Sequence, residues 1–526
     1  MNTSSPTLLC NKTAWISLSL IGTFAFGEPK PAIPFSDHMV LQRDMANPVW
    51  GTADPSEKIS VSIAGQNKHT TAGKDGSWQV NLDPLKVGGP HQLVIAGTDK
   101  TLTYKDVLVG EVWLGSGQSN MAGGAGGYAK NNPPLAKIIE QAPYPNLRLL
   151  HNKGAAWKVA DAKACASFSA ILLSFGVPLH KELDVPVGLM LGAVGGTPSG
   201  RWLTKEMLED DAGVSQALKQ WNKAHDLDKE LAAYDKALAK WEKLAAEAKA
   251  QKKRAPRKPQ KPVQGGDFAG RRVGDLYDAF INRLVPYGMR GVLWDQGESG
   301  TSIRELDQYV TMGALIRGWR QAWGQGDFPF LYVQKPSGYS SAYKVNKDDL
   351  ETMLANPFAT LPSKANPDDR GGLYRELHVR IRNHPNTAMV TALDLGPGVH
   401  PRNKAGYGAR GARVALGFVY GQDHAIYGPS YKSQVIEGNL VRVGFSDLGI
   451  GLAIGQGTKL QGFAIAGKDK VFHWANAKIE GDYVVLSSSE VKAPVAVRYG
   501  WARKREWANL FNKDGLPATT FRTDDW

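Results

Sequence analysis

The stretch Val109–Met121, VGEVWLGSGQSNM, decides how the rest of the chain is interpreted. An apolar, β-rich run ends at Gly115–Gly117, and the polar trio Gln118, Ser119 and Asn120 follows it. Glycine permits a tight turn there and lets a substrate approach the backbone closely. A buried strand that ends in this way can place a nucleophilic serine at the carboxyl edge of a sheet. An ordinary strand-to-helix turn with a capping Ser or Asn has the same pattern.

The chain downstream of this stretch alternates strands with helices. A helix is expected over 168–183, and buried strands are expected over 185–194, 291–294, 328–333 and 388–393. Such alternation predicts an α/β domain with a mainly parallel sheet, here residues 107–426.

The two flanking regions have a β rhythm. Residues 28–106 and 427–526 contain short alternating segments separated by turns, and we expect a β-sandwich-like domain at each end. Residues 1–27 resemble a secretory signal, with Lys12 ahead of an apolar stretch and a small-residue cleavage pattern at 25–27. This apolar run is too short to span a bilayer comfortably, so we expect a secreted or periplasmic protein without a membrane span.

Composition narrows the choice of partners. The net charge of +13 includes a basic, Pro-containing run over 249–261, which is typical of a solvated linker, so nucleic-acid binding is not expected. The two cysteines are Cys10, within the expected signal, and Cys165. One remaining thiol excludes a disulfide framework and a multi-cysteine zinc site.

An insertion over about 206–262 interrupts the α/β domain. Its apolar residues follow a 4-3-4-3 spacing, which predicts one helical stripe on a helix from Val214 to Lys253: Leu227, Leu231, Tyr234, Leu238 and Trp241. The preceding polar segment is expected to form a helical partner. The insertion is then either a helical hairpin or an arm that joins two copies of the chain.

A nucleophilic Ser119 would need a base, an oxyanion hole and a group that orients the base. The nucleophile elbow of α/β-hydrolases does not fit, because Met121 stands where its second glycine belongs. His400 lies in a Gly/Pro loop after the strand expected to end at Leu393, and it is a candidate general base.

Two further strand ends carry candidate groups for the acyl site. The amide of Gln296 and a backbone N–H of Gly195 or Gly196 could donate to an oxyanion. Glu298 could orient a base or bind a sugar hydroxyl.

Taken in order, these motifs resemble the sialate O-acetylesterase family within the SGNH-type serine esterases. The resemblance covers nearly the whole chain outside the insertion, and its most specific pieces are GQSNM, QGES and HPRNK, at 117–121, 296–299 and 400–404. It implies an SGNH-hydrolase-like α/β domain that removes O-acetyl groups from sialic acid or an acetylated polysaccharide.

The resemblance also implies roles for individual residues, without a metal or an organic cofactor. Ser119 is the expected nucleophile and His400 the expected general base. The oxyanion hole is expected from the N–H of Ser119, an N–H of Gly195 or Gly196, and the Gln296 amide. Gln118, Asn120 and Asp295 flank these groups as expected substrate contacts.

The chain departs from the family pattern at the carboxylate that usually orients the catalytic histidine. SGNH esterases usually carry an Asp two or three residues before the catalytic His, where this chain has Gly398 and Pro397. The orienting carboxylate is then Glu298, which we prefer, or Asp394, or it is absent. The alternative function is a catalytically weakened carbohydrate-binding protein that retains the esterase fold.

Overall fold

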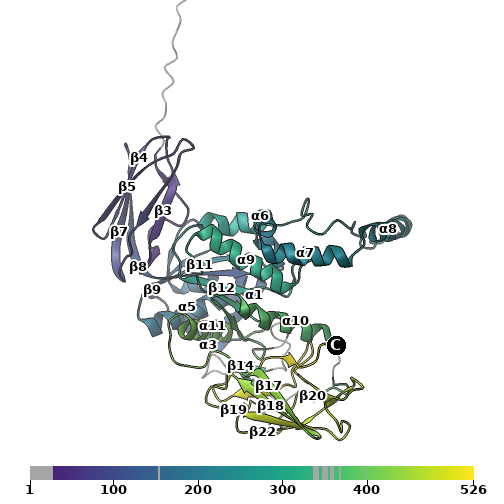
Figure 1. Cartoon of the computed structure of the whole chain (residues 1–526). Helices are drawn as coiled ribbons and strands as arrows, with labels where there is room; N and C mark the ends of the chain where they lie inside the picture. The colour runs from purple at the N-terminus through teal and green to yellow at the C-terminus, as the bar shows by residue number, and fades with distance from the viewer. Residues whose placement is uncertain are drawn as a thin grey trace, which may run out of the picture.

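The computed structural model describes residues 28–151, 154–335, 343–345, 353–355, 360–365, 369–396, 398–455 and 457–526. The expected signal segment, residues 1–27, lies outside the described residues. Figure 1 shows an N-terminal β region, a central α/β region and a C-terminal β region following one another along the molecule.

A large, mainly parallel sheet forms the centre of the molecule and confirms the predicted α/β class. Six neighbouring strands run parallel, in the order β9 (Tyr144–Leu150), β11 (Val187–Ala193), β8 (Thr101–Gly117), β12 (Gly291–Asp295), β13 (Phe330–Val333) and β16 (Thr387–Val390). The short β10 (Lys158–Ala160) pairs antiparallel with β9. Because all six parallel strands point the same way, their carboxyl ends share one edge.

The strand predicted over 388–393 ends early. β16 stops at Val390, which is opposite Val333, the last residue of β13. Beyond this pair, Gln334 still donates its backbone N–H to the Val390 carbonyl at 2.9 Å, but no further ladder forms. The loop that carries His400 therefore begins three residues sooner than the sequence indicated.

Helices cover both faces of the sheet. One face packs against α5 (Ala170–Leu183) and α11 (Lys404–Phe418), which approach closely because Gly408 has no side chain to meet the backbone of Ile171. The other face packs against α9 (Gln308–Trp323). Successive residues of β12 point to opposite faces. Leu293 accordingly packs in the core between the sheet and helices α5 and α11, and Trp294 packs in the core on the side of α9.

Shorter helices complete the central region. They are α1 (Ser119–Ala122), α2 (Ala125–Ala129), α3 (Pro133–Glu140), α4 (Ala162–Ser167), α6 (Lys205–Glu209) and α10 (Asp369–Arg380), with a π-helical turn at Tyr277–Ile281 and a small hairpin of β14 (Tyr343–Val345) and β15 (Met353–Ala355). No helix in the described ranges is both long and apolar enough to cross a bilayer.

The N-terminal β region shares a strand with the central sheet. Residues 101–106 of β8 alternate between exposed and half-buried, whereas residues 107–117 are buried on both faces. The N-terminal half of β8 pairs with β7 in one sheet, and a second, three-stranded sheet lies beside it. The N-terminal strands are β1 (Lys30–Pro31), β2 (Val40–Gln42), β3 (Asn47–Thr52), β4 (Lys58–Ile63), β5 (Gln66–Thr71), β6 (Ser77–Leu82) and β7 (Gly88–Ala96).

The C-terminal region is built from antiparallel strands around its own core, which includes Val443, Phe463 and Tyr499. One sheet has the order β17 (Ser430–Glu437), β18 (Leu440–Ser446), β23 (Tyr483–Ser487), β22 (Asn476–Glu480). A second has the order β21 (Phe472–Trp474), β20 (Phe463–Ala466), β24 (Ala496–Tyr499), β26 (Phe521–Arg522), and β19 (Leu452–Ile454) pairs with β25 (Leu510–Asn512).

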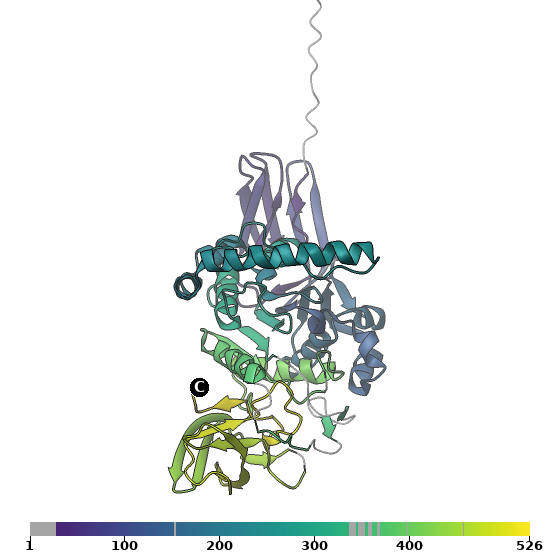
Figure 2. The same ribbon diagram turned by 90° about the vertical axis from the view of Figure 1, so that its right-hand side faces the viewer.

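The insertion corrects the prediction of a single helix over 214–253. Two helices, α7 (Ala212–Ala224) and α8 (Leu227–Ala250), take the place of that helix, because His225 is extended and the Asp226 side chain caps α8 by accepting the Lys229 N–H at 3.1 Å. Figures 1 and 2 show that α8 turns sharply away from α7 and projects from the body, so the two helices do not form a packed hairpin.

The chain returning from α8 covers part of its apolar stripe. The stripe residues are half-buried, although no residue of α8 is fully buried. Trp241 donates its indole N–H to the Pro256 carbonyl at 2.8 Å, and the Lys258 ammonium lies over the same ring at 5.4 Å. The basic segment thus packs on the helix that precedes it, and joining of two copies through this arm stays a prediction.

Candidate active site

The turn that carries Ser119 is held tightly against β12. Gly117, the last residue of β8, has φ = +127°, and a Cβ there would overlap the backbone of Asp295. Gln118 donates its backbone N–H to the Asp295 carbonyl at 2.8 Å. Ser119 then begins α1 at the carboxyl edge of the sheet. Glycine is required at 117 because of both its backbone conformation and this close approach.

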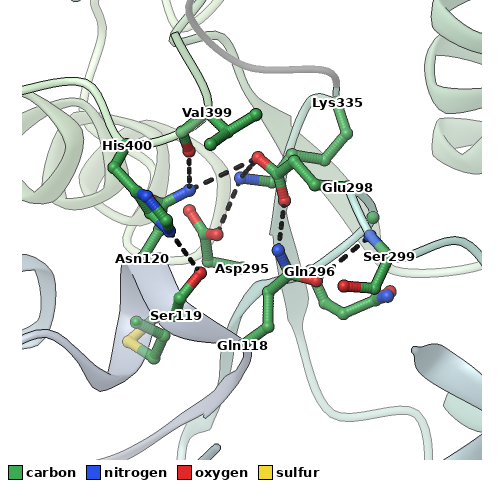
Figure 3. A network of polar contacts seen from close by, with 12 residues as sticks. Gln118, Ser119, Asn120, Asp295, Gln296, Glu298, Ser299, Lys335, Val399 and His400 are labelled. Atoms are coloured by element: carbon green, nitrogen blue, oxygen red, sulfur yellow. Dashed lines mark hydrogen bonds and ion pairs between the residues drawn. The ribbon is translucent and has the colours of Figure 1, made fainter. Parts of the chain in front are cut away.

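The structure brings Ser119 and His400 together from two different strand-end loops. The Nε2 atom of His400 lies 2.8 Å from the Ser119 hydroxyl (Figure 3). This distance is within the range expected between a nucleophile and its general base. His400 is exposed and Ser119 is half-buried, so the pair can be reached from solvent.

The glycine pair after β11 lies close to Ser119. Gly195 is close enough that a Cβ on it would lie 3.5 Å from the Ser119 Cβ, and Gly196 has φ = +70° with open space around it. Across the described part of the chain, the backbone N–H groups of Ser119, Gly195 and Gly196 donate no hydrogen bond. These groups have the chemistry needed to bind an oxyanion.

Gln296 is placed differently from the sequence expectation. Its amide nitrogen donates to the carbonyl oxygens of Thr197, at 3.2 Å, and Gly300, at 2.9 Å, and its oxygen accepts from Gln308 at 3.3 Å. The side chain is also buried. Since both amide N–H groups bond to the backbone, this residue links the loop after β11 to the loop after β12 and has no N–H left to donate to an oxyanion.

The two candidate carboxylates bond to different partners, and neither partner is His400. Asp394 forms a two-pronged ion pair with Arg410 of α11, at 2.5 and 2.8 Å. Glu298 accepts hydrogen bonds from Gln118 at 2.7 Å and Asn120 at 3.3 Å. Among the residues that the structure describes, the hydroxyl of Ser119 is the sole hydrogen-bond partner of the His400 ring.

Asn120 links Glu298 to the histidine loop (Figure 3). Its amide nitrogen donates to Glu298 and also to the carbonyl of Val399, at 3.1 Å, one residue before His400. Its amide oxygen accepts from the ammonium of Lys404 at 2.5 Å. The NH₂ group and the oxygen of this amide therefore both have partners within the protein.

The three residues expected to contact substrate are buried and bond to other protein groups. The side chains of Gln118, Asn120 and Asp295 are at most 3% exposed. Gln118 bonds to Glu298, and Asp295 forms an ion pair with Lys335 at 2.7 Å. A sugar cannot contact these groups without displacing protein partners, so they act on the site by supporting its loops.

Two buried lysines complete this network, and sequence reasoning gave neither of them a role. Lys335 bonds to Asp295 and, at 2.9 Å, to Glu298. Burial raises the pKa of Asp295 and opposes the charge of Lys335. The two carboxylates outweigh that burial and hold the pKa of Lys335 above its usual value. Burial lowers the pKa of Lys404 to about 7.

Signals for both lysines were present in the sequence. Lys335 follows a buried strand at the same sheet edge as Ser119, and Lys404 lies within the HPRNK motif.

Comparisons with known proteins agree with this fold. No family model matches the chain. The chain is 28% identical to the sialate O-acetylesterase of Rattus norvegicus over 451 residues, covering 75% of this chain and 74% of the rat protein. It is 27% identical to the Homo sapiens enzyme of the same name over 435 residues, covering 74% and 71%. This chain is a homologue of the sialate O-acetylesterases.

A solved structure supports the same relationship. The crystal structure of a carbohydrate acetylesterase from Xanthomonas citri matches with a TM-score of 0.72 and 29% identity, covering 95% of this chain and 100% of the other. The family resemblance seen in the sequence is confirmed, and the chain is a carboxylic ester hydrolase.

Proposed function

We propose that this chain is a serine esterase that removes O-acetyl groups from sugars, either sialic acid or an acetylated polysaccharide, through an acetyl-serine intermediate. The observation that carries the proposal is the 2.8 Å contact between the Ser119 hydroxyl and Nε2 of His400. It occurs in a chain whose relatives are named sialate O-acetylesterase and carbohydrate acetylesterase. The proposed organisation is an SGNH-type domain over 107–426, with the insertion at about 206–262, between β domains over 28–106 and 427–526.

Acylation needs a base for the serine and donors for the oxyanion. His400 accepts the hydroxyl proton through Nε2 as the Ser119 oxygen attacks the acetyl carbonyl. The resulting tetrahedral oxyanion accepts hydrogen bonds from the backbone N–H of Ser119 and of Gly195 or Gly196, which have no acceptor within the described ranges. In this scheme Gln296 holds two loops together and does not donate to the oxyanion.

Collapse of this intermediate releases the sugar. The C–O bond to the sugar breaks, and protonated His400 gives its proton to the departing sugar oxygen. This step leaves acetyl-Ser119. A water molecule then gives a proton to His400 and attacks the acetyl carbonyl, which releases acetate and restores the serine hydroxyl.

We further propose that the histidine is oriented through its loop and not by a carboxylate on its ring. Asn120 holds the carbonyl of Val399, and Glu298 and Lys404 hold Asn120. Glu298 is then a positioning residue that acts through Asn120. This arrangement replaces the direct acid–histidine contact of the usual triad.

Acetate release by the purified full chain tests the proposal. We expect hydrolysis of p-nitrophenyl acetate and release of acetate from O-acetylated sialic acid or acetylated xylan. Ser119→Ala and His400→Ala should each lower this rate by at least about 10³-fold. Full activity in Ser119→Ala would refute the assignment.

A second candidate, a carbohydrate-binding protein with little catalysis, is favoured by one observation. Within the described ranges no carboxylate contacts His400. A serine-reactive phosphonate distinguishes the two functions, because labelling at Ser119 requires an activated hydroxyl. Labelling would eliminate the binding protein, whereas glycan binding without labelling would eliminate the esterase.

We also propose that the protein is exported, to the periplasm or outside the cell, on the strength of residues 1–27. Amino-terminal sequencing of the exported protein tests this, with cleavage close to Gly27 as the expected result. A protein that retains Met1 in the cytoplasmic fraction would overturn it.

A further inference from the structure

The C-terminal β region carries a cavity that the esterase chemistry does not use. Its volume is about 750 Å³, which falls within the range of ligand-binding pockets. It lies between the edge strand β21, the final residue Trp526 and residues 363–365 of the central region. Ligand sites are common where two parts of a fold meet in this way.

Aromatic rings form one wall of this cavity. β21 pairs with β20, at the end of its sheet order, and its residues Phe472 and Trp474 lie on the same face because they are two positions apart. Both rings are half-buried, and the Trp526 side chain is 40% exposed. Large apolar surfaces that stay open to solvent beside polar groups mark binding sites.

The wall is rigid. Arg498 stacks on Phe472, with its guanidinium carbon 4.3 Å from the ring centre. It also forms hydrogen bonds to both carboxylate oxygens of Asp524 and to the Trp526 carbonyl, at 2.6 to 2.8 Å. Trp474 donates its indole N–H to the Pro362 carbonyl at 2.7 Å. These contacts fix the aromatic groups before any ligand arrives, which lowers the entropy cost of binding.

Short polar side chains face the same space. Asn476, Ser489 and Glu490 are exposed at the cavity, and they supply both donors and acceptors. Lys364 adds an ammonium group, and the ammonium of Lys470 lies over one face of the Trp526 ring, 4.8 Å from its centre. The charge of Arg498 is already matched by Asp524, and the Glu490 carboxylate accepts a hydrogen bond from the Ser489 hydroxyl at 3.3 Å.

We propose that this cavity is a carbohydrate-binding site that holds a glycan chain away from the catalytic serine. A pyranose ring has an apolar C–H face, which stacks on an aromatic ring and leaves water, and a rim of hydroxyls, which bond to amide, hydroxyl and carboxylate groups. The cavity offers both surfaces. The site would attach the protein to polymeric substrate, and it stands independently of the proposed esterase mechanism.

Affinity electrophoresis of the full chain tests this site, in gels that contain acetylated xylan, deacetylated xylan or polysialic acid. We expect at least one polymer to retard the protein. Trp526→Ala should weaken that binding by about tenfold or more, and Asn476→Ala should weaken it by a smaller factor. Hydrolysis of p-nitrophenyl acetate, a substrate without sugar, should be unchanged in both variants.

A matched control uses Tyr483, an aromatic residue of the same region that is 44% exposed and does not line the cavity. Tyr483→Ala should bind the polymer as the parent does. Equal retardation of the parent, Trp526→Ala and Asn476→Ala would overturn the proposal, as would a parent that no polymer retards. Absence of ester hydrolysis in the parent would refute the proposed function, but the comparison of polymer binding among the variants would still test the cavity.

Discussion

The substitution Glu298→Gln tests whether the Glu298 carboxylate positions His400 for catalysis or only stabilises the fold. Glu298 accepts hydrogen bonds from Gln118 at 2.7 Å, Lys335 at 2.9 Å and Asn120 at 3.3 Å. In Glu298→Gln, the new NH₂ group must face one of these donors. The variant loses at least one hydrogen bond to a charged group, which is worth about 1.5–3 kcal/mol.

The substitution should lower kcat because Glu298 reaches His400 through Asn120 and the Val399 carbonyl. Loss of the negative charge weakens the hydrogen bond that Glu298 accepts from Asn120, so Asn120 holds the Val399 carbonyl less firmly and the His400 ring shifts relative to Ser119. A misplacement of about 1 Å can cost about 100-fold in rate, and we expect kcat to fall by about 10- to 100-fold. Loss of a carboxylate that touches the histidine directly costs about 10⁴-fold in the serine protease triad.

Asp394→Asn is the matched control. It makes the same chemical change in an ion pair with Arg410, which does not reach His400, so kcat should change by less than about threefold. The assay is kcat on p-nitrophenyl acetate, with the free energy of unfolding measured in parallel by denaturant titration. An equal or larger loss of kcat in Asp394→Asn would refute the reasoning.

Three further changes test the fold that supports the site. Gly117→Ala should cost about 3 kcal/mol or more, measured by urea unfolding, whereas Gly127→Ala, which meets no atom within 4 Å, should be neutral or stabilising by up to about 1 kcal/mol. Burial lowers the pKa of His378 from 6.5 to about 3, so below pH 6.5 the unfolded chain binds a proton that the folded chain does not, and stability should fall by about 2 kcal/mol between pH 6.5 and 5. His378→Gln should flatten that slope, and an unchanged slope would contradict the assignment. Replacement of residues 226–262 by a short Gly/Ser linker should leave ester hydrolysis intact, because Asn222 and Gly265 exchange hydrogen bonds at 3.0 and 3.1 Å and close the base of the arm; size-exclusion chromatography of the same variant tests whether α8 joins two copies.

The sequence predicted the parts of the fold that depend on local pattern. The β-rich run before Ser119, the alternation of strands and helices and the β rhythm of the two ends all come from hydrophobic periodicity. The place of His400 beside Ser119 could be anticipated because residues that follow parallel strands gather at one sheet edge. The arm was harder to predict, since the apolar spacing begins at Leu227 and gives no signal of the break at His225.

The side-chain partners could not be predicted from the sequence. Glu298 and Asp394 are both carboxylates close to a strand end, and only the fold shows that Lys335 faces one and Arg410 the other. Gln296 matched an oxyanion donor in type and in place along the chain. Its amide bonds instead to two carbonyls that the fold brings beside it. Such pairings depend on three-dimensional contacts between distant segments, which carry no signal in local spacing.

The most direct test of the central claim is to trap the acyl-enzyme. The protein is mixed with p-nitrophenyl acetate, quenched in acid within the burst phase, digested and analysed by mass spectrometry. The account predicts one added acetyl group on the peptide that contains Ser119 and none on that peptide from Ser119→Ala. Acetate release at the full rate with no acetyl group at Ser119, or with the acetyl group on another residue, would contradict it.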